Sequence, residues 1–96
     1  MKLDIIWSKK AALGYSEILQ YLDKEWTERE VKNFEIEVNQ FLNKLSKYPS
    51  ILKGSKKTNL RRGPINKLTM LTYRVDEKKN QLQLINIRGA RQQPLL

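Results

Sequence analysis

The sequence predicts an α+β fold in which a helical hairpin covers one face of a small, twisted, mainly antiparallel sheet. Two observations predict it. Apolar residues follow a helical period between residues 9 and 48, and the period becomes strand-like after Pro49. A short apolar run before residue 8 adds an N-terminal strand, which gives the order β-α-α-β-β-β. Neither layer can bury its apolar side alone, so we expect residues 1–96 to form a single domain.

The N-terminal part begins with a strand that leads into a helix. Residues 3–7 (Leu-Asp-Ile-Ile-Trp) form the apolar run, and Ser8 follows as a candidate N-cap. Apolar residues then recur at helical spacing as far as about Lys24. They are Ala11, Tyr15, Ile18 and Leu22.

A second helix is predicted from a capping box. Thr27 is followed three positions later by Glu30, so each side chain can bind the backbone N–H of the other residue. An apolar residue then occurs every three or four positions until Pro49 ends the helix. These residues are Val31, Phe34, Val38, Phe41, Leu45 and Tyr48. Since about three residues separate the two helices, they form an αα-hairpin.

Three strands are predicted after a basic loop at residues 51–59. The first covers residues 60–65, where Pro64 predicts an edge position or a bulge. The second covers residues 68–75, and the third covers residues 81–88 after a turn at residues 76–80. In the third strand, Leu82 and Leu84 fall on one face, whereas Ile85 and Ile87 fall on the other. This pattern predicts either a central strand buried on both sides or a bulge near Leu84.

The net charge of +9 is confined to the second half of the chain. Residues 1–52 contain eight Lys/Arg and eight acidic residues, whereas residues 53–96 contain eleven Lys/Arg and only Asp76 and Glu77. Such segregated positive charge is typical of proteins that bind a polyanion or an acidic protein. A basic surface that serves only solubility is the alternative.

Two residue types that carry much of protein chemistry are missing. The chain has no cysteine and no histidine, so it has no disulfide, no thiolate and no imidazole base. A zinc site is close to excluded, and we expect no metal and no cofactor. No apolar run approaches the roughly 20 residues of a membrane span, and the N-terminus lacks the apolar region of a signal peptide. We therefore expect a cytoplasmic protein with no membrane partner.

Several short motifs between about residue 3 and residue 94 carry a family resemblance. They are Trp7-Ser8 with Ala11 and Ile18; Phe41, Leu45 and Pro49 at the helix end, with Gly54 after them; Arg61-Arg62; the strand Leu71-Thr72-Tyr73-Arg74-Val75, with Asp76 after it; and Arg91-Gln92-Gln93-Pro94. Together they resemble the RelE/ParE family of toxins from bacterial type II toxin–antitoxin systems, in particular its ParE-like, plasmid-stabilisation subgroup. The family fold is a helical hairpin on a small antiparallel sheet, which agrees with the prediction above.

The resemblance implies a toxin that inhibits bacterial growth. It also implies a cognate antitoxin as partner, with an acidic or amphipathic C-terminal segment. ParE-like toxins poison DNA gyrase, and we expect this activity because the Arg-x-x-Pro ending accompanies the missing general base. The alternative is a RelE-like, metal-independent endoribonuclease that cleaves mRNA on the ribosome with a Lys/Arg cluster. A second alternative is a nucleic-acid-binding module without toxicity.

The candidate site consists of arginines and lysines of the second half. Guanidinium and ammonium groups can hold the charge of a phosphorane or protonate a leaving oxygen. The catalytic candidates are Arg61, Arg74, Arg88 and Arg91, and the candidates for binding nucleic acid or the target are Lys53, Lys56, Lys57 and Arg62. By the resemblance, Arg61 matches a strand arginine of RelE-like enzymes, and the three lysines match their basic loop. Arg88 stands where many ParE-like relatives have histidine or an aromatic residue.

These candidates also have structural alternatives. A guanidinium is a poor base at neutral pH, so an enzyme would need a lysine with a lowered pKa. Arg61 and Arg62 follow each other on a strand, so at most one of them faces a given site. Arg74 is able to pair with Asp76 or Glu77. Two tyrosines are expected to pack with their hydroxyls at the surface, Tyr48 and Tyr73.

Overall fold

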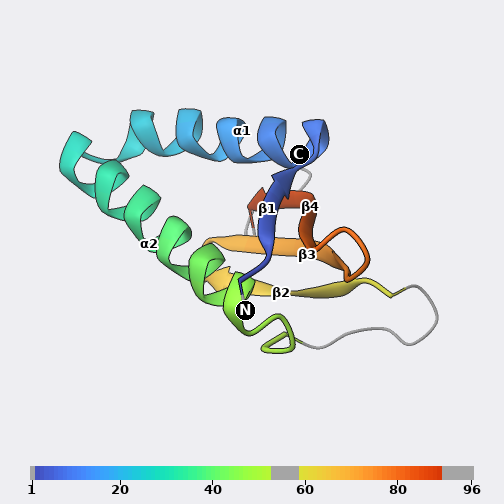
Figure 1. Cartoon of the computed structure of the whole chain (residues 1–96). Coiled ribbons are helices and arrows are strands. Elements are labelled where there is room, and N and C mark those ends of the chain that lie inside the picture. The colour runs from blue at the N-terminus through green and yellow to red at the C-terminus, as the bar shows by residue number, and fades with distance from the viewer. Residues whose placement is uncertain (1, 53–58, 90–96) are drawn as a thin grey trace.

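The computed structural model describes residues 2–52 and 59–89. Its elements are β1 (Asp4–Trp7), α1 (Lys9–Glu25), α2 (Glu28–Lys47), β2 (Arg61–Asn66), β3 (Thr69–Asp76) and β4 (Gln81–Gly89). The predicted order β-α-α-β-β-β is therefore confirmed. Figure 1 shows α1 and α2 joined as a hairpin, with both helices on one side of the sheet.

The sheet is mixed, with the strand order β1-β4-β3-β2. β1 runs parallel to β4, with Asp4 opposite Gln81, and the other two pairs of strands are antiparallel. β2 is an edge strand, and its pairing with β3 becomes irregular just after Pro64. Both features that Pro64 predicts are present, because a residue without an N–H is tolerated where no neighbouring strand needs that donor.

A bulge in β4 decides between the two alternatives for its apolar residues. Thr72 of β3 lies opposite Asn86, whereas the next residue, Tyr73, lies opposite Leu84. Ile85 is therefore the extra residue, and it shifts Ile87 to the face that already carries Leu84. Three β4 residues on this face are fully buried: Leu82, Leu84 and Ile87. The bulge near Leu84 is confirmed, and β4 needs only one apolar face.

Ser8 joins the bulge to the start of α1. Its backbone N–H donates to Leu84 O at 3.0 Å, and its hydroxyl donates to Ile85 O at 2.9 Å. The same hydroxyl accepts from the Ala11 N–H at 2.9 Å, which is the predicted N-cap bond. One side chain thus caps a helix and satisfies a carbonyl that the bulge leaves without a ladder partner.

The second helix begins as its sequence predicts. The Thr27 hydroxyl accepts from the Glu30 N–H at 3.2 Å, and the Glu30 carboxylate accepts from the Thr27 N–H at 3.0 Å. The helix ends at Lys47, one residue before Tyr48. Tyr48 therefore leaves the apolar face and is 62% exposed, so its placement in the helical stripe is wrong. Leu42, which the stripe omits, is buried instead.

The core fills the space between the hairpin and the facing side of the sheet. Its buried apolar residues are Ala11, Ile18, Leu22, Phe34, Val38, Leu42, Leu45, Ile65, Leu71, Tyr73, Leu82, Leu84 and Ile87. Gly14 sets the distance between α1 and β4. A β-carbon at this position would overlap Ile87 O and lie 3.0 Å from the Ile87 carbonyl carbon. Only glycine lets the two backbones approach this closely.

A chain of aromatic rings packs along the hairpin. Trp7 and Tyr15 lie 5.5 Å apart between ring centroids, Tyr15 and Phe34 lie 6.3 Å apart, and Phe34 and Trp26 lie 6.2 Å apart. The chain links β1, both helices and the connection between them. The Tyr15 hydroxyl is buried in it, and no residue of the described ranges forms a hydrogen bond with it.

The Tyr15 environment predicts a loss of stability in alkali. Burial, followed by the Glu35 carboxylate, raises the pKa of Tyr15 to about 12 from its ordinary 10. Because the folded pKa is the higher one, this stabilisation is complete below about pH 10 and is lost as the pH rises toward 12. Tyr15→Phe is expected to unfold like the wild type in urea at neutral pH and to lose less stability above pH 10.

Tyr21→Phe is the matched control for this comparison, because Tyr21 on the same helix is 57% exposed. The Tyr21→Phe protein should have the same stability in urea as the wild type at neutral pH and above pH 10. Equal alkaline losses in the Tyr15→Phe protein and the wild type would contradict the prediction.

Candidate functional site

The two arginines at the start of β2 lie on opposite faces of the sheet. Arg61 lies opposite the buried Tyr73 and Arg62 lies opposite Thr72. Cross-strand partners share a face, so Arg61 is on the side of the hairpin and Arg62 on the other side. Arg62 is exposed and Arg61 is half-buried.

The side of the sheet turned away from the hairpin, here called the outer sheet face, carries three arginines. Arg62, Arg74 and Arg88 are exposed and come from three neighbouring strands. The same face also carries Met70, Thr72, Gln83 and Asn86, and at one end of it Asp4 and Asp76 lie on either side of Gln81. Arg62 pairs with Thr72, and Arg88 pairs with Met70. Met70, Thr72 and Arg74 follow one another at two-residue intervals on β3. Arg88, Arg62 and Arg74 are therefore spaced about 7 Å apart along the strand direction.

Arg74 is held over β4 by an amide and not by a carboxylate. Its Nε and Nη2 both donate to Gln83 Oε1, at 3.1 and 2.9 Å. Gln83 in turn donates through Nε2 to Gln81 Oε1 at 3.1 Å. These hydrogen bonds from Arg74 to Gln83 and from Gln83 to Gln81 hold the plane of the Arg74 guanidinium group on the outer sheet face.

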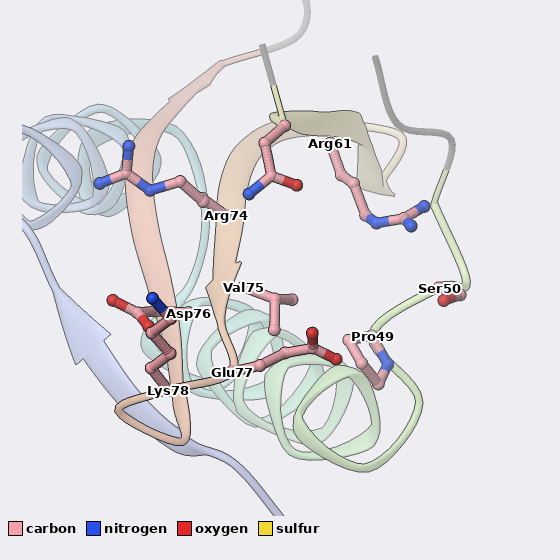
Figure 2. Close-up of a pocket in the computed structure, with 9 residues that line it drawn as sticks. Pro49, Ser50, Arg61, Arg74, Val75, Asp76, Glu77 and Lys78 are labelled. Atoms are coloured by element: carbon pink, nitrogen blue, oxygen red, sulfur yellow. The ribbon is translucent and has the colours of Figure 1, made fainter. Parts of the chain in front are cut away.

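A cavity of about 490 Å³ opens at the end of the sheet where β2 begins and β3 ends. We call it the end pocket; its lining residues are Pro49, Ser50, Asn59, Arg61, Arg74, Val75, Asp76, Glu77 and Lys78. Figure 2 shows Arg61 extending toward Ser50 and Arg74 extending the other way, toward β4. The pocket therefore brings two candidate arginines to one place but directs their guanidinium groups apart, and it has acidic as well as basic walls.

The other candidate residues that the structure describes, Arg62 and Arg88, do not line the end pocket. Arg88 lies opposite Met70, near the end of β4 that is remote from the end pocket, and shares only the outer sheet face with Arg74. Four candidates lie outside the described residues: Lys53, Lys56, Lys57 and Arg91. Of the candidate arginines, Arg62, Arg74 and Arg88 thus share the outer sheet face, whereas Arg61 lies on the side of the hairpin.

Tyr73 has a role that its sequence position does not reveal. Its side chain is 0% exposed, and its hydroxyl donates to Pro49 O. Burial raises the pKa of Tyr73, although Arg61 and a hydrogen bond with the Leu52 backbone act in the opposite direction. The hydroxyl therefore stays protonated at neutral pH and serves as a donor. The expectation that it reaches the surface is wrong for Tyr73, because the turn after α2 folds over it.

Arg61 binds the other end of the same turn. Its Nη1 donates to Leu52 O at 2.9 Å. The Leu52 side chain packs on Gly63, where an added β-carbon would lie 2.9 Å from Leu52 Cδ2. Arg61 thus already has a partner within the protein before any ligand is bound.

Within residues 2–52 and 59–89, no three acidic side chains gather into a group that could hold a metal ion. In the same ranges, neither helix combines the length and the apolar character that crossing a membrane requires.

Comparison of the sequence with protein-family models and with curated proteins gives no match. Comparison of the structure with solved structures does. A chain of the toxin–antitoxin complex RelBE2 from Mycobacterium tuberculosis has a TM-score of 0.63 at 14% identity, over 93% of this chain and 99% of that chain. The protein has a RelE/ParE-type toxin fold. The conserved hypothetical protein HP0894 from Helicobacter pylori is also similar in structure to this chain, with a TM-score of 0.55 and 17% identity over 92% of this chain and 94% of that chain.

The fold that the resemblance implies is therefore confirmed. At these identities the comparison concerns the RelE/ParE-type fold alone, and the ParE-like subgroup stays a prediction.

Proposed function

We propose that this protein is the toxin of a type II toxin–antitoxin module of the plasmid-stabilisation kind and that its free form stops bacterial growth. The observation that carries the proposal is the fold shared with a chain of the RelBE2 toxin–antitoxin complex over nearly the whole of both chains. Residues 1–96 act as one domain in the cytoplasm, where both possible targets lie.

The partner in this proposal is a cognate antitoxin whose C-terminal segment is acidic or amphipathic. The cationic outer sheet face supports it, because Arg62, Arg74 and Arg88 are exposed on three neighbouring strands. Positive potential on one face accelerates association with an acidic partner and fixes its orientation.

For the target we propose DNA gyrase, as in ParE-like toxins. Arg61 and Arg74 in the end pocket both have hydrogen-bond partners within the protein, Leu52 O and Gln83, and their guanidinium groups point apart. That arrangement supports a role in binding better than joint stabilisation of one phosphorane, which needs convergent donors. Cleavage of mRNA on the ribosome remains the alternative, favoured by the row of arginines on the outer sheet face.

Expression of the full chain from an inducible promoter tests the proposal. We expect growth to stop, and co-expression of a small acidic protein encoded beside it to restore growth. Pulse-labelling then separates the targets, since a gyrase poison stops DNA synthesis first and a ribosome-dependent nuclease stops protein synthesis first. Supercoiling assays with purified gyrase and toeprinting on ribosomes give the direct test of each.

Uninterrupted growth at high expression would overturn the toxin assignment. Nucleic-acid binding with a steep salt dependence but no growth arrest would favour the non-toxic binding module instead.

A further inference from the structure

We propose that Gln83 is a positioning residue that holds Arg74 on the outer sheet face without neutralising it, so that the guanidinium group is ready to bind a carboxylate of an acidic protein segment. The inference rests on the proposed function, because it concerns the acidic partner named there. It adds which side chain prepares the outer sheet face for that partner and which donors of Arg74 make the contact.

Gln83 bonds one edge of the Arg74 guanidinium group. The two residues lie directly opposite each other on β4 and β3, and Figure 2 shows Arg74 extending toward β4. Nε and Nη2 both donate to Gln83 Oε1, at 3.1 and 2.9 Å. A guanidinium group has five N–H donors, so these two bonds leave Nη1 and the second N–H of Nη2 for a ligand. Those two nitrogens form a fork that a carboxylate can bind with both of its oxygens.

Gln83 is itself oriented by a second amide. Its Nε2 donates to Gln81 Oε1 at 3.1 Å, two residues earlier on β4. This bond uses the amide nitrogen and so turns the amide oxygen toward Arg74. Both glutamines are half-buried, whereas Arg74 is exposed. The acceptor therefore has less freedom than the side chain that it positions.

Two carboxylates near Arg74, both within the described ranges, do not bind it. Asp76 is two residues further along β3 on the same face, and Asp4 lies on the other side of Gln81. Asp76 Oδ1 accepts instead from the Lys79 N–H at 3.2 Å, within the turn between β3 and β4. A carboxylate in the place of the Gln83 amide would cancel the charge that attracts an acidic partner. The neutral amide orients the guanidinium group and leaves its charge intact.

The same two aspartates favour a protein segment over a nucleic acid. Asp76 lies about 7 Å beyond Arg74 along the strand direction. A nucleic acid carries a phosphate at every nucleotide, so a strand that continues past Arg74 would bring phosphates close to Asp76 and Asp4. A protein segment can present a carboxylate to Arg74 and a neutral or basic side chain to the aspartates. The charge pattern at this end of the outer sheet face therefore fits an acidic protein segment better than a uniform polyanion.

Nuclear magnetic resonance of the purified full chain tests the anchoring itself. The Arg74 Nε–H should exchange with water at least fivefold more slowly than the Nε–H of the exposed Arg62, because Gln83 is its acceptor. Gln83→Leu removes the acceptor at unchanged charge and should bring the two rates together. Asn86→Leu is the matched control, since Asn86 is an amide on the same strand and face that does not bond Arg74. An Arg74 exchange rate that Gln83→Leu does not affect would overturn the inference.

A double-mutant cycle tests whether Gln83 acts through Arg74. The probe is a short fluorescein-labelled peptide that alternates glutamate and serine. Its affinity is measured at low salt for the wild type, Gln83→Leu, Arg74→Gln and the combined variant. We expect Gln83→Leu to weaken binding about two- to tenfold in the wild type, which is the cost of immobilising one long side chain, and to have little effect once Arg74 is gone. Equal weakening in both backgrounds, or no weakening in either, would overturn the positioning role.

Gln83→Glu separates orientation from charge. It keeps an acceptor for Arg74 but makes an ion pair, so exchange of the Arg74 Nε–H should stay slow while the peptide binds more weakly. Gln20→Glu is the matched control, because it lowers the net charge equally at an exposed position of α1. Equal affinities of these two variants for the peptide would contradict the role assigned to the neutral amide.

Failure of this inference is distinguishable from failure of the proposed function. All of these measurements use purified protein and do not depend on toxicity, whereas the proposed function fails when the wild type does not stop growth. Repeating the cycle with a short, fluorescein-labelled, single-stranded RNA tests the kind of partner. Weaker binding of the RNA by the Gln83→Leu protein, without weaker binding of the peptide, would overturn the choice of an acidic protein segment.

Discussion

Replacing Gly14 by alanine is expected to destabilise the protein by about 3 kcal/mol or more, which is the upper range for overpacking a filled core. The added methyl group would overlap the Ile87 carbonyl oxygen, which belongs to a strand and cannot move independently. α1 would have to shift away from β4 and lose its contacts with the apolar side of the sheet. Urea unfolding followed by circular dichroism should show a lower midpoint at an unchanged slope.

Ser16→Ala is the control for helix propensity, since Ser16 is exposed two residues further along α1. At an exposed helical position alanine is favoured over serine and glycine, so this variant should be as stable as the wild type or slightly more stable. A Gly14→Ala protein of wild-type stability would show that α1 does not approach β4 as closely as described.

Neutralising the outer sheet face is expected to have the largest effect on binding. A variant with Arg62, Arg74 and Arg88 all changed to glutamine should bind single-stranded RNA at least tenfold more weakly at low salt. Its plot of log affinity against log salt should be less steep by about 2, because each lost phosphate contact removes about 0.7 from the slope for a single strand. Growth arrest by this variant should be weaker as well, since both proposed targets carry nucleic acid.

A second triple variant removes the same charge from the side of the hairpin. Lys9, Lys10 and Lys24 are exposed on α1. Changing all three to glutamine lowers the net charge equally but leaves the outer sheet face intact, and it should reduce RNA affinity much less. Equal losses in the two triple variants would mean that overall charge, rather than the outer sheet face, determines binding.

Local rules in the sequence account for most of the secondary structure. The spacing of Thr27 and Glu30 predicts the start of α2, and Pro49 predicts that the helix ends just before it. The position of Pro64 predicts an edge strand, and the shift of apolar residues at Leu84 predicts the bulge. Each of these features depends on residues a few positions apart, and local backbone chemistry decides them.

Features that depend on distant residues were not predictable in the same way. The close approach of Gly14 to Ile87 and the hydrogen bond of the Tyr73 hydroxyl with Pro49 O follow from tertiary packing, which no local pattern encodes. In the candidate site, strand alternation correctly separates Arg61 from Arg62. The partner of Arg74 depends on the register of β3 and β4, which places Gln83 beside it instead of a carboxylate.

The parallel pairing of β1 with β4 also has a consequence for the order of events when the protein is made. Ser8, directly after β1, bonds Ile85 of β4 across 77 positions of sequence. At a synthesis rate of about 5–20 residues per second, the nascent chain waits roughly 4–15 s before the partner of its first strand exists. The hairpin can become helical in that interval, but it has no sheet to pack on. The complete sheet, and with it the capping of α1 by Ser8 against the β4 bulge, therefore forms only after β4 has been translated.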